Sequence, residues 1–426
     1  MQGAGNVLEA PAWDGDAPGP GHGPEGPPSA RAGSPTAAPA HLWQVDVVRL
    51  GAFTAVIAVH TLAFTVAPSN RLAAGAMMVL QFGREVFFAL SAFVLVYAAG
   101  RRGALGRPRG PEPGDRPEGC DRRAFWSRRF AVVGVPYLAW SAIYYGYSVL
   151  GPRHAPATLP AFAHDLAWGG AEYHLYFLLV TMQLYLVFPW LLTFVRASAH
   201  CAGRVLVGVG ALNVGWLAVV QWVPAPAGPA GWLWHRAYEL LPTYGLCVLA
   251  GAYAAAHFAS LHRFVGRHGR ALAAAALVAV SGALLAYAVQ LPGTRPRSAA
   301  AVLQPATLAA SAAAVVVLYS LGTRWAEGRR RHQRGVAALS DASFGVYLAH
   351  PLVLQLMVDN RVAIGGQHVP AAAATIVAFV ATGAGATAIS LAARRTAVSL
   401  LLTGRPRQRR RQVAQTVPSQ EVPRCK

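Results

Sequence analysis

Apolar runs long enough to cross a membrane recur along the chain from Val45 onward, separated by polar or basic breaks. A hydrocarbon layer of about 30 Å needs about 20 helical residues. The runs are continuously apolar and do not alternate, so they predict helices and exclude a β-barrel. We predict an all-α integral membrane protein, a bundle of about ten transmembrane helices. The predicted spans are 45–66, 76–99, 130–150, 171–195, 204–223, 237–256, 271–290, 299–321, 342–358 and 370–392.

The segments outside the spans have a different composition. Residues 1–44 are rich in Pro, Gly and Ala, which predicts a disordered N-terminal tail. The first apolar run starts only near Val45 and no basic region precedes it, so a cleaved signal peptide is not expected. We therefore divide the chain into this tail, a transmembrane domain at 45–395 and a basic C-terminal tail at 396–426.

Composition supports the membrane interpretation. Apolar residues make up 54% of the chain and charged residues only 13%, with a mean hydropathy of +0.37. Soluble domains carry about 25% charged residues, so an ordinary cytosolic enzyme is excluded. The four cysteines show neither CxxC pairing nor metal-ligand spacing, and we expect no disulfide framework and no metal site.

The positively charged residues follow the predicted membrane topology. The chain has 37 Lys and Arg against 17 Asp and Glu, a net charge of +20 that raises the question of nucleic acid. With ten spans, 29 of these basic residues fall on one side of the membrane and 6 on the other. The positive-inside rule then places both termini in the cytoplasm. We predict no nucleic-acid partner; the RRR runs at 329–331 and 409–411 suit anionic membrane lipids instead.

The first span carries two ionisable residues on one face. Arg49 and His60 are eleven positions apart, which at 100° per residue returns to within about 20° of the same direction and separates them by roughly 16 Å. Ionisable groups inside a membrane are costly and are functional candidates. Each also has a simpler interpretation: Arg49 can extend to the lipid headgroups, and a lone histidine can be a hydrogen-bonded core residue.

Other spans carry polar groups in the predicted outer half. Arg84 and Glu85 lie in the second span, near the depth expected for His60. Adjacent helical positions point about 100° apart, so we expect that these two side chains do not simply pair with each other and that at least one has a partner on another helix. His174, Glu239 and His350 map to a similar depth. Two interpretations fit these residues, a structural polar network and a water-accessible reaction or transport cavity, and the cavity is favoured.

Several motifs resemble one family. VDVVRLGAFTAVIAVH at 45–60 resembles the first-span signature of the membrane acyltransferase-3 family, an Arg followed by ten residues and a His. FFALSAF at 87–93 is similar to the second-span FFxxSGF, and SFGVYLAH at 343–350 to the late Tyr-x-x-His span. FWSRRFAVVGVPYLAW at 125–140 resembles the basic loop that leads into a Pro-aromatic span, and HLYFLLVTMQLYLVFP at 174–189 the aromatic fourth span. The resemblance covers nearly all of the membrane part.

The resemblance implies an acyl-CoA-dependent O-acyltransferase. It would move an acyl group, usually acetyl, from cytoplasmic acyl-CoA to a hydroxyl of a glycan or a glycosylated metabolite, with no permanently bound cofactor. Arg49, Arg128 and Arg129 are the candidates that bind the polyanionic donor. His174, Tyr347 and His350 are the candidate substrate-binding residues. Abundant Ala, Arg and Gly indicate that the gene comes from a GC-rich bacterial genome. We therefore expect a protein of the bacterial plasma membrane.

Three residues are the catalytic candidates. An imidazole such as that of His60 can take the hydroxyl proton and later protonate the leaving thiolate. Arg84 is a candidate for stabilising the oxyanion, as are protonated His174 and His350. Glu85 is the candidate that orients the His60 ring.

Other functions stay open at this stage. A polytopic transporter or flippase would also place Arg, His and Glu inside the membrane, and a catalytically inactive lipid-binding scaffold would fit the same composition. Ser91, within FFALSAF, is the rival as a catalytic nucleophile, although direct transfer is favoured because no base lies near it in sequence.

Overall fold

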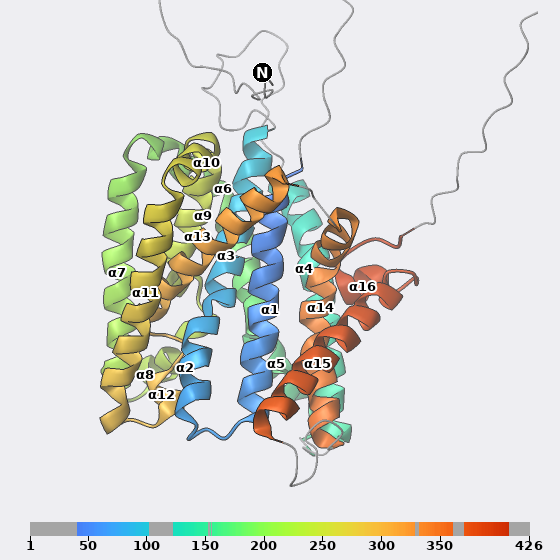
Figure 1. Ribbon diagram of the computed structural model, residues 1–426. Coiled ribbons are helices and arrows are strands. Elements are labelled where there is room, and N and C mark those ends of the chain that lie inside the picture. The colour runs from blue at the N-terminus through green and yellow to red at the C-terminus, as the bar shows by residue number, and fades with distance from the viewer. Residues whose placement is uncertain are drawn as a thin grey trace, which may run out of the picture.

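The helices form one bundle around α1 (Figure 1). The computed structural model describes residues 41–101, 122–151, 154, 156–328, 332–360 and 370–408, and within these ranges every regular element is helical. The predicted tails lie largely outside these residues. The predicted spans correspond to α1 (Trp43–Thr65), α2 (Arg71–Leu80) with α3 (Phe82–Arg101), α4 (Arg122–Leu150), α6 (Tyr176–Ala197), α7 (Ala202–Trp222), α9 (Gly245–Ala256), α11 (Gly269–Gln290), α13 (Pro305–Glu327), α14 (Gln333–Asp359) and α15 (Ala371–Ala393).

Five short helices were not expected from the sequence. They are α5 (Leu159–Trp168), α8 (Pro229–His235), α10 (Phe258–Arg267), α12 (Pro296–Ala299) and α16 (Ser399–Thr403). Helices α5, α8 and α12 cover the end of the bundle that is lowest in Figure 1. The segment predicted as the C-terminal tail thus begins with a helix, α16, which packs against α4 and α14.

The described part of the chain has eight helices that are long and apolar enough to span a membrane. A ninth span is formed if Leu241–Ala256 and Phe258–Arg267, which meet at 93°, count as one. The predicted number of ten is therefore not confirmed. Helix α4 has 29 residues, enough for a span, but its tyrosines and its four N-terminal arginines make it less apolar than the others.

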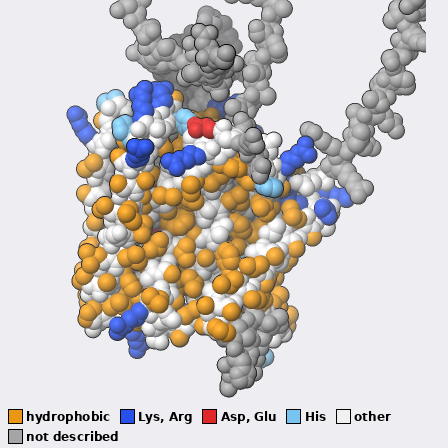
Figure 2. All heavy atoms as spheres, in the orientation of Figure 1, with side chains coloured by type: hydrophobic (Ala, Val, Ile, Leu, Met, Phe, Trp, Pro, Cys, Tyr) orange, Lys and Arg blue, Asp and Glu red, His pale blue; other side chains and the backbone are white. Residues whose placement is uncertain are grey.

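The outer surface is suited to lipid. Figure 2 shows a broad band of hydrophobic side chains between an upper end that carries most of the visible arginines and a lower end with few. On α7 and α11, large apolar side chains such as Val207, Leu212 and Val278 are more than 70% exposed. An apolar patch of this extent would be unfavourable in water. The protein is a multi-pass membrane protein.

Helix α1 lies at the centre of the bundle. It packs against α3, α13, α14 and α15. At Gly322 of α13, an added Cβ would lie 2.8 Å from the Cα of Gln44, so this glycine permits the close crossing with α1. The main core is aromatic and joins α3, α4, α6 and α14. We call the end that holds the first turns of α1, α4 and α14 the basic end.

Candidate active site

Three histidines that are far apart in sequence meet inside the bundle. His60 of α1 and His350 of α14 have ring centroids 5.4 Å apart, and the His350 and His174 centroids are 5.5 Å apart. His174 and His350 are fully buried, whereas His60 is half-buried. We call these three residues the histidine cluster. The structure thus brings together three of the polar residues that the sequence placed at a similar depth.

A turn before α6 brings His174 into the cluster. Helix α5 ends at Gly169, which adopts the left-handed conformation with φ of 68°. A Cβ at Gly169 would lie 2.6 Å from the Cα of Tyr176, so only glycine allows the chain to fold back this closely. Ala171, Glu172, His174 and Leu175, between these residues, are buried, so the chain enters the bundle before α6 starts at Tyr176. The predicted span 171–195 therefore begins as an irregular segment.

Tyrosine hydroxyl groups hold the backbone around the cluster. The hydroxyl of Tyr347 donates to the carbonyl of His174 at 2.8 Å, which joins α14 to the segment before α6. The hydroxyl of Tyr144, on α4, donates to the carbonyl of Leu348 at 2.7 Å and accepts from the amide of Leu352 at 3.2 Å. Tyr347, predicted to bind substrate, therefore supports the shape of the site from its edge.

The histidine side chains themselves have few partners. His350 Nδ1 lies 2.6 Å from the carbonyl oxygen of Tyr347. Among the described residues, His350 Nε2 and both ring nitrogens of His174 have no hydrogen bond of normal geometry, and His60 makes none. The ring of Tyr173 packs against the ring of His60, with the centroids 4.4 Å apart and the planes inclined at 43°. Imidazole nitrogens with free lone pairs are able to exchange protons with a bound molecule.

Sequence reasoning missed a buried polar pair beside the cluster. Gln355 of α14 donates through Nε2 to Glu172 Oε2, and both side chains are buried. Glu172 lies two positions before His174, and Gln355 lies five positions after His350. An acidic residue within an apolar stretch is the signal that could have identified Glu172.

Arg84 and Glu85 form an ion pair with each other, so the expectation that these neighbours do not pair is wrong. The Arg84 stem is flexible enough to cover the 100° between adjacent positions, and burial strongly favours pairing of the two charges. The expected partner on another helix is replaced by a loop: Arg84 Nη2 donates to the carbonyl of Val302, between α12 and α13, at 3.0 Å. The guanidinium also lies 5.3 Å from the centre of the ring of Tyr244, in the 3₁₀ turn Leu241–Tyr244.

This ion pair lies outside the histidine cluster. Gly83 packs against Ala52 and Val56 of α1, which aligns the two antiparallel helices. At 1.5 Å per residue, Glu85 is then roughly 12 Å closer to the basic end than His60. The described residues show no contact between Glu85 and His60. Glu239 is paired as well: both of its carboxylate oxygens accept from Arg236 Nη1 at 3.1 Å.

Arg49 is held at the basic end by a small polar network. Its Nη1 donates to Ser340 Oγ at 2.9 Å and to Asp46 Oδ1 at 3.3 Å, and Ser340 Oγ donates to Asp46 Oδ1 at 2.6 Å. Asp46 Oδ2 also pairs with His41. The network orients the guanidinium while 27% of the Arg49 side chain remains accessible. Arg49 and His60 are therefore at different levels of α1, as their spacing predicted.

More arginines surround this end. Arg128 is exposed on α4, and the half-buried Arg129 lies 5.9 Å from the ring centres of Phe125 and Tyr185. Arg394 and Arg405 both pair with Asp341 of α14, next to Ser340. Arg394 and Arg405 were counted only as topology signals by sequence reasoning. Because positive charges exceed negative ones here, the basic end can attract a polyanion.

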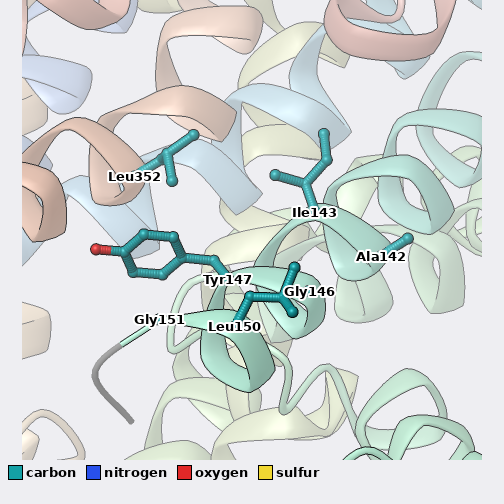
Figure 3. A pocket seen from close by; sticks show the side chains of 7 residues that line it. All are labelled: Ala142, Ile143, Gly146, Tyr147, Leu150, Gly151 and Leu352. Carbon is teal, nitrogen blue, oxygen red and sulfur yellow. The ribbon is translucent and has the colours of Figure 1, made fainter. Parts of the chain in front are cut away.

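A surface groove of about 460 Å³ lies between α4 and α14 (Figure 3). It is lined by Ala142, Ile143, Gly146, Tyr147, Leu150, Gly151 and Leu352. None of the three cluster histidines and none of the arginines of the basic end lines it, so the groove is separate from both. Among the described residues, no three His, Cys, Asp or Glu side chains are arranged to hold a metal ion.

The fold and the site define a multi-pass membrane protein with a cluster of three histidines in its interior. A family model described as an acyltransferase domain, acyltransferase-3, matches residues 42–395. The chain belongs to this family, which makes it an acyltransferase and disfavours a transporter. No curated protein and no solved structure matches the chain.

Proposed function

We propose that this protein transfers an acyl group, acetyl in the simplest case, from acyl-CoA bound at the basic end to a hydroxyl group of a carbohydrate or glycosylated acceptor at the histidine cluster. The observation that carries the proposal is the arrangement on α1, where Arg49 belongs to the basic end and His60 to the cluster. The two positions are roughly 16 Å apart along the helix. A pantetheine arm is long enough to bridge this distance.

The donor would bind through its phosphate groups. Arg49, Arg128 and Arg129 provide guanidinium groups, which recognise phosphate through paired hydrogen bonds. The network of Asp46 and Ser340 supports this role because it restricts the Arg49 side chain before the donor arrives. The thioester would then extend toward the half-buried face of His60.

His60 would act as general base and then as general acid. It takes the proton of the acceptor hydroxyl while the oxygen attacks the thioester carbonyl, and it returns the proton to the thiolate as the carbon–sulfur bond breaks. His174 is the better candidate to donate to the developing oxyanion, because Glu85 already neutralises Arg84. Ser91 is two turns beyond Glu85 and roughly 21 Å from His60 along the helix axes, which argues against a Ser91 acyl-enzyme that uses this base.

The acceptor would be a hydroxylated glycan of the bacterial envelope or a glycosylated metabolite. The test is a comparison of both in a wild-type and a deletion strain by mass spectrometry. We expect the deletion to remove one acyl group from one of these molecules, and complementation to restore it. Identical masses in both fractions would contradict the proposed acceptor class.

Substitution of Arg49 is expected to weaken donor binding. In Arg49→Ala, the dissociation constant for acetyl-CoA should rise about 10-fold or more, because a charge-assisted contact is lost. Arg49→Lys should recover only part of the affinity, since an ammonium lacks the planar fork of the guanidinium. Titration calorimetry in detergent measures both constants. Arg204→Ala is the control, because Arg204 is exposed on α7. Unchanged affinity in Arg49→Ala would move the donor site elsewhere.

The membrane orientation can be tested at two glycines. We expect the basic end and both termini to face the cytoplasm. Gly266, in α10, lies just before α11 and Gly293 lies just after it, so the two positions flank opposite ends of this helix. A Cβ at either position would meet no atom within 4 Å. With the native cysteines replaced, a membrane-impermeant maleimide should label Gly293→Cys in intact cells and Gly266→Cys only after permeabilisation. Labelling of Gly266→Cys in intact cells would contradict this orientation.

A further inference from the structure

One carbonyl of α14 lacks its helical partner because of a proline. In an α-helix the carbonyl of Tyr347 would accept from the amide of residue 351, but Pro351 has no N–H. The ring of His350 takes the place of that amide, with Nδ1 2.6 Å from the carbonyl oxygen. Pro351 therefore creates an acceptor that is reached by the neighbouring histidine.

This contact determines which nitrogen of His350 carries hydrogen. A carbonyl oxygen can only accept, so Nδ1 must be the N–H group. In the neutral ring, Nε2 then has a free lone pair. Nε2 is buried and has no hydrogen-bond partner among the described residues. A histidine that only capped the carbonyl would use Nδ1 and would leave Nε2 without a role.

The free nitrogen belongs to a ring that faces His60. The centroids of the two rings are 5.4 Å apart, close to the roughly 5 Å expected for imidazoles joined by an N–H···N bond of about 3 Å. The half-buried His60 ring is near enough to His350 for such a bond once one of its nitrogens is turned toward Nε2. Glu85, the residue expected to orient His60, is bound to Arg84.

We propose that Pro351 and the Tyr347 carbonyl fix His350 as a hydrogen-bond acceptor that orients His60, which makes His350 a positioning residue. Neutral His60 donates its N–H to His350 Nε2, so that its other nitrogen presents a lone pair to the acceptor hydroxyl. The proton taken from that hydroxyl stays on His60 until the thiolate receives it, and His350 gains no proton. The role resembles that of the carboxylate in a hydrolytic triad. This proposal rests on the proposed function of His60.

Two variants of similar size separate positioning from packing. The amide of Gln extends to the position of Nε2, whereas the amide of Asn extends only to that of Nδ1. His350→Gln should therefore keep turnover within about 10-fold of the wild type, and His350→Asn should lose about 100-fold or more. Affinity for acetyl-CoA should be unchanged in both. Thiol release from acetyl-CoA measures turnover, and equal activity of the two folded variants would overturn the positioning role.

A measurement without turnover tests the fixed tautomer. The full-length protein is labelled with ¹⁵N in its histidine rings and placed in lipid bilayers for solid-state NMR, and the His350 signals are assigned by their loss in His350→Gln. We expect a protonated Nδ1 and an unprotonated Nε2 in the wild type, and a mixture of tautomers in Pro351→Ala, where the backbone amide competes for the carbonyl. A protonated Nε2 in the wild type would overturn the proposal. If the tautomer is as expected but neither the wild-type protein nor any variant releases thiol from acetyl-CoA, the proposed function fails and the tautomer proposal stands.

Discussion

Replacing His60 with Asn is expected to lower turnover by roughly 10² to 10⁴, the usual contribution of positioned proton transfer. Asn retains a polar group of similar size, so the loss cannot be assigned to an emptied cavity. Folding and affinity for acetyl-CoA should stay near wild-type values, because His60 makes no hydrogen bond with the described residues and the basic end is distant from it. Thiol release by protein in lipid nanodiscs measures the rate.

The pH dependence adds a second signature of the same group. Only neutral imidazole accepts a proton, so the wild-type rate should rise with pH while His60 loses its proton, and this rise should be absent from residual activity of His60→Asn. His268→Asn is a matched control, since His268 is exposed at the basic end and contacts the carbonyl of Phe264 in its own region of the chain. A folded His60→Asn variant with near wild-type turnover would make His60 structural and move the base to His174 or His350.

Replacing Gly251 with Ala is expected to cause a large loss of stability. A Cβ at Gly251 of α9 would lie 2.0 Å from the carbonyl oxygen of Ala89 and 2.7 Å from its carbon, both backbone atoms of α3. The two helices would have to separate along their extensive contact, where packing of small residues holds membrane helices together. We expect a cost of about 1–3 kcal/mol or more in unfolding free energy.

The control for Gly251 is a glycine in a helix with open surroundings. Gly208 of α7 has no atom within 4 Å of an added Cβ, so Gly208→Ala should be neutral or stabilising by up to about 1 kcal/mol through helix propensity. Thermal unfolding in detergent, followed by circular dichroism, compares the two. Equal midpoints of thermal unfolding for Gly251→Ala and Gly208→Ala would show that the stability of the protein does not depend on the close approach of α3 and α9.

Apolar run length was a good guide to the existence of the helices and a poor guide to their ends. Helix α14 starts at Gln333, nine residues before the predicted span, because Ser340 and Asp341 continue the helix while binding Arg49, Arg394 and Arg405. Hydropathy cannot detect a polar extension of this kind. The predicted span 237–256 starts with two short 3₁₀ turns, Ala237–Glu239 and Leu241–Tyr244, and only its last 12 residues form the α-helix α9.

The candidate site was predictable where the residues concerned lie on the same helix. The spacing of Arg49 and His60 needs only the helical repeat, and the structure has them at separate levels of α1. The partners of Arg84 and Glu85 were misjudged because side-chain flexibility and burial, not Cβ direction, decide such a pair. The His350 tautomer depends on Pro351 and on a neighbouring ring from another helix, which sequence spacing alone cannot relate.

The transfer of an acyl group to a hydroxyl is tested most directly with acetyl-CoA that carries ¹⁴C in the acetyl group. Membranes of the deletion strain are supplied with wild-type protein or with His60→Asn and incubated with this donor. We predict that wild-type protein moves label into a glycan or glycosylated fraction as an ester, which mild alkali releases as acetate, and that His60→Asn does not. Label that stays on acetyl-CoA with wild-type protein, or that resists alkali as an amide, would contradict the account.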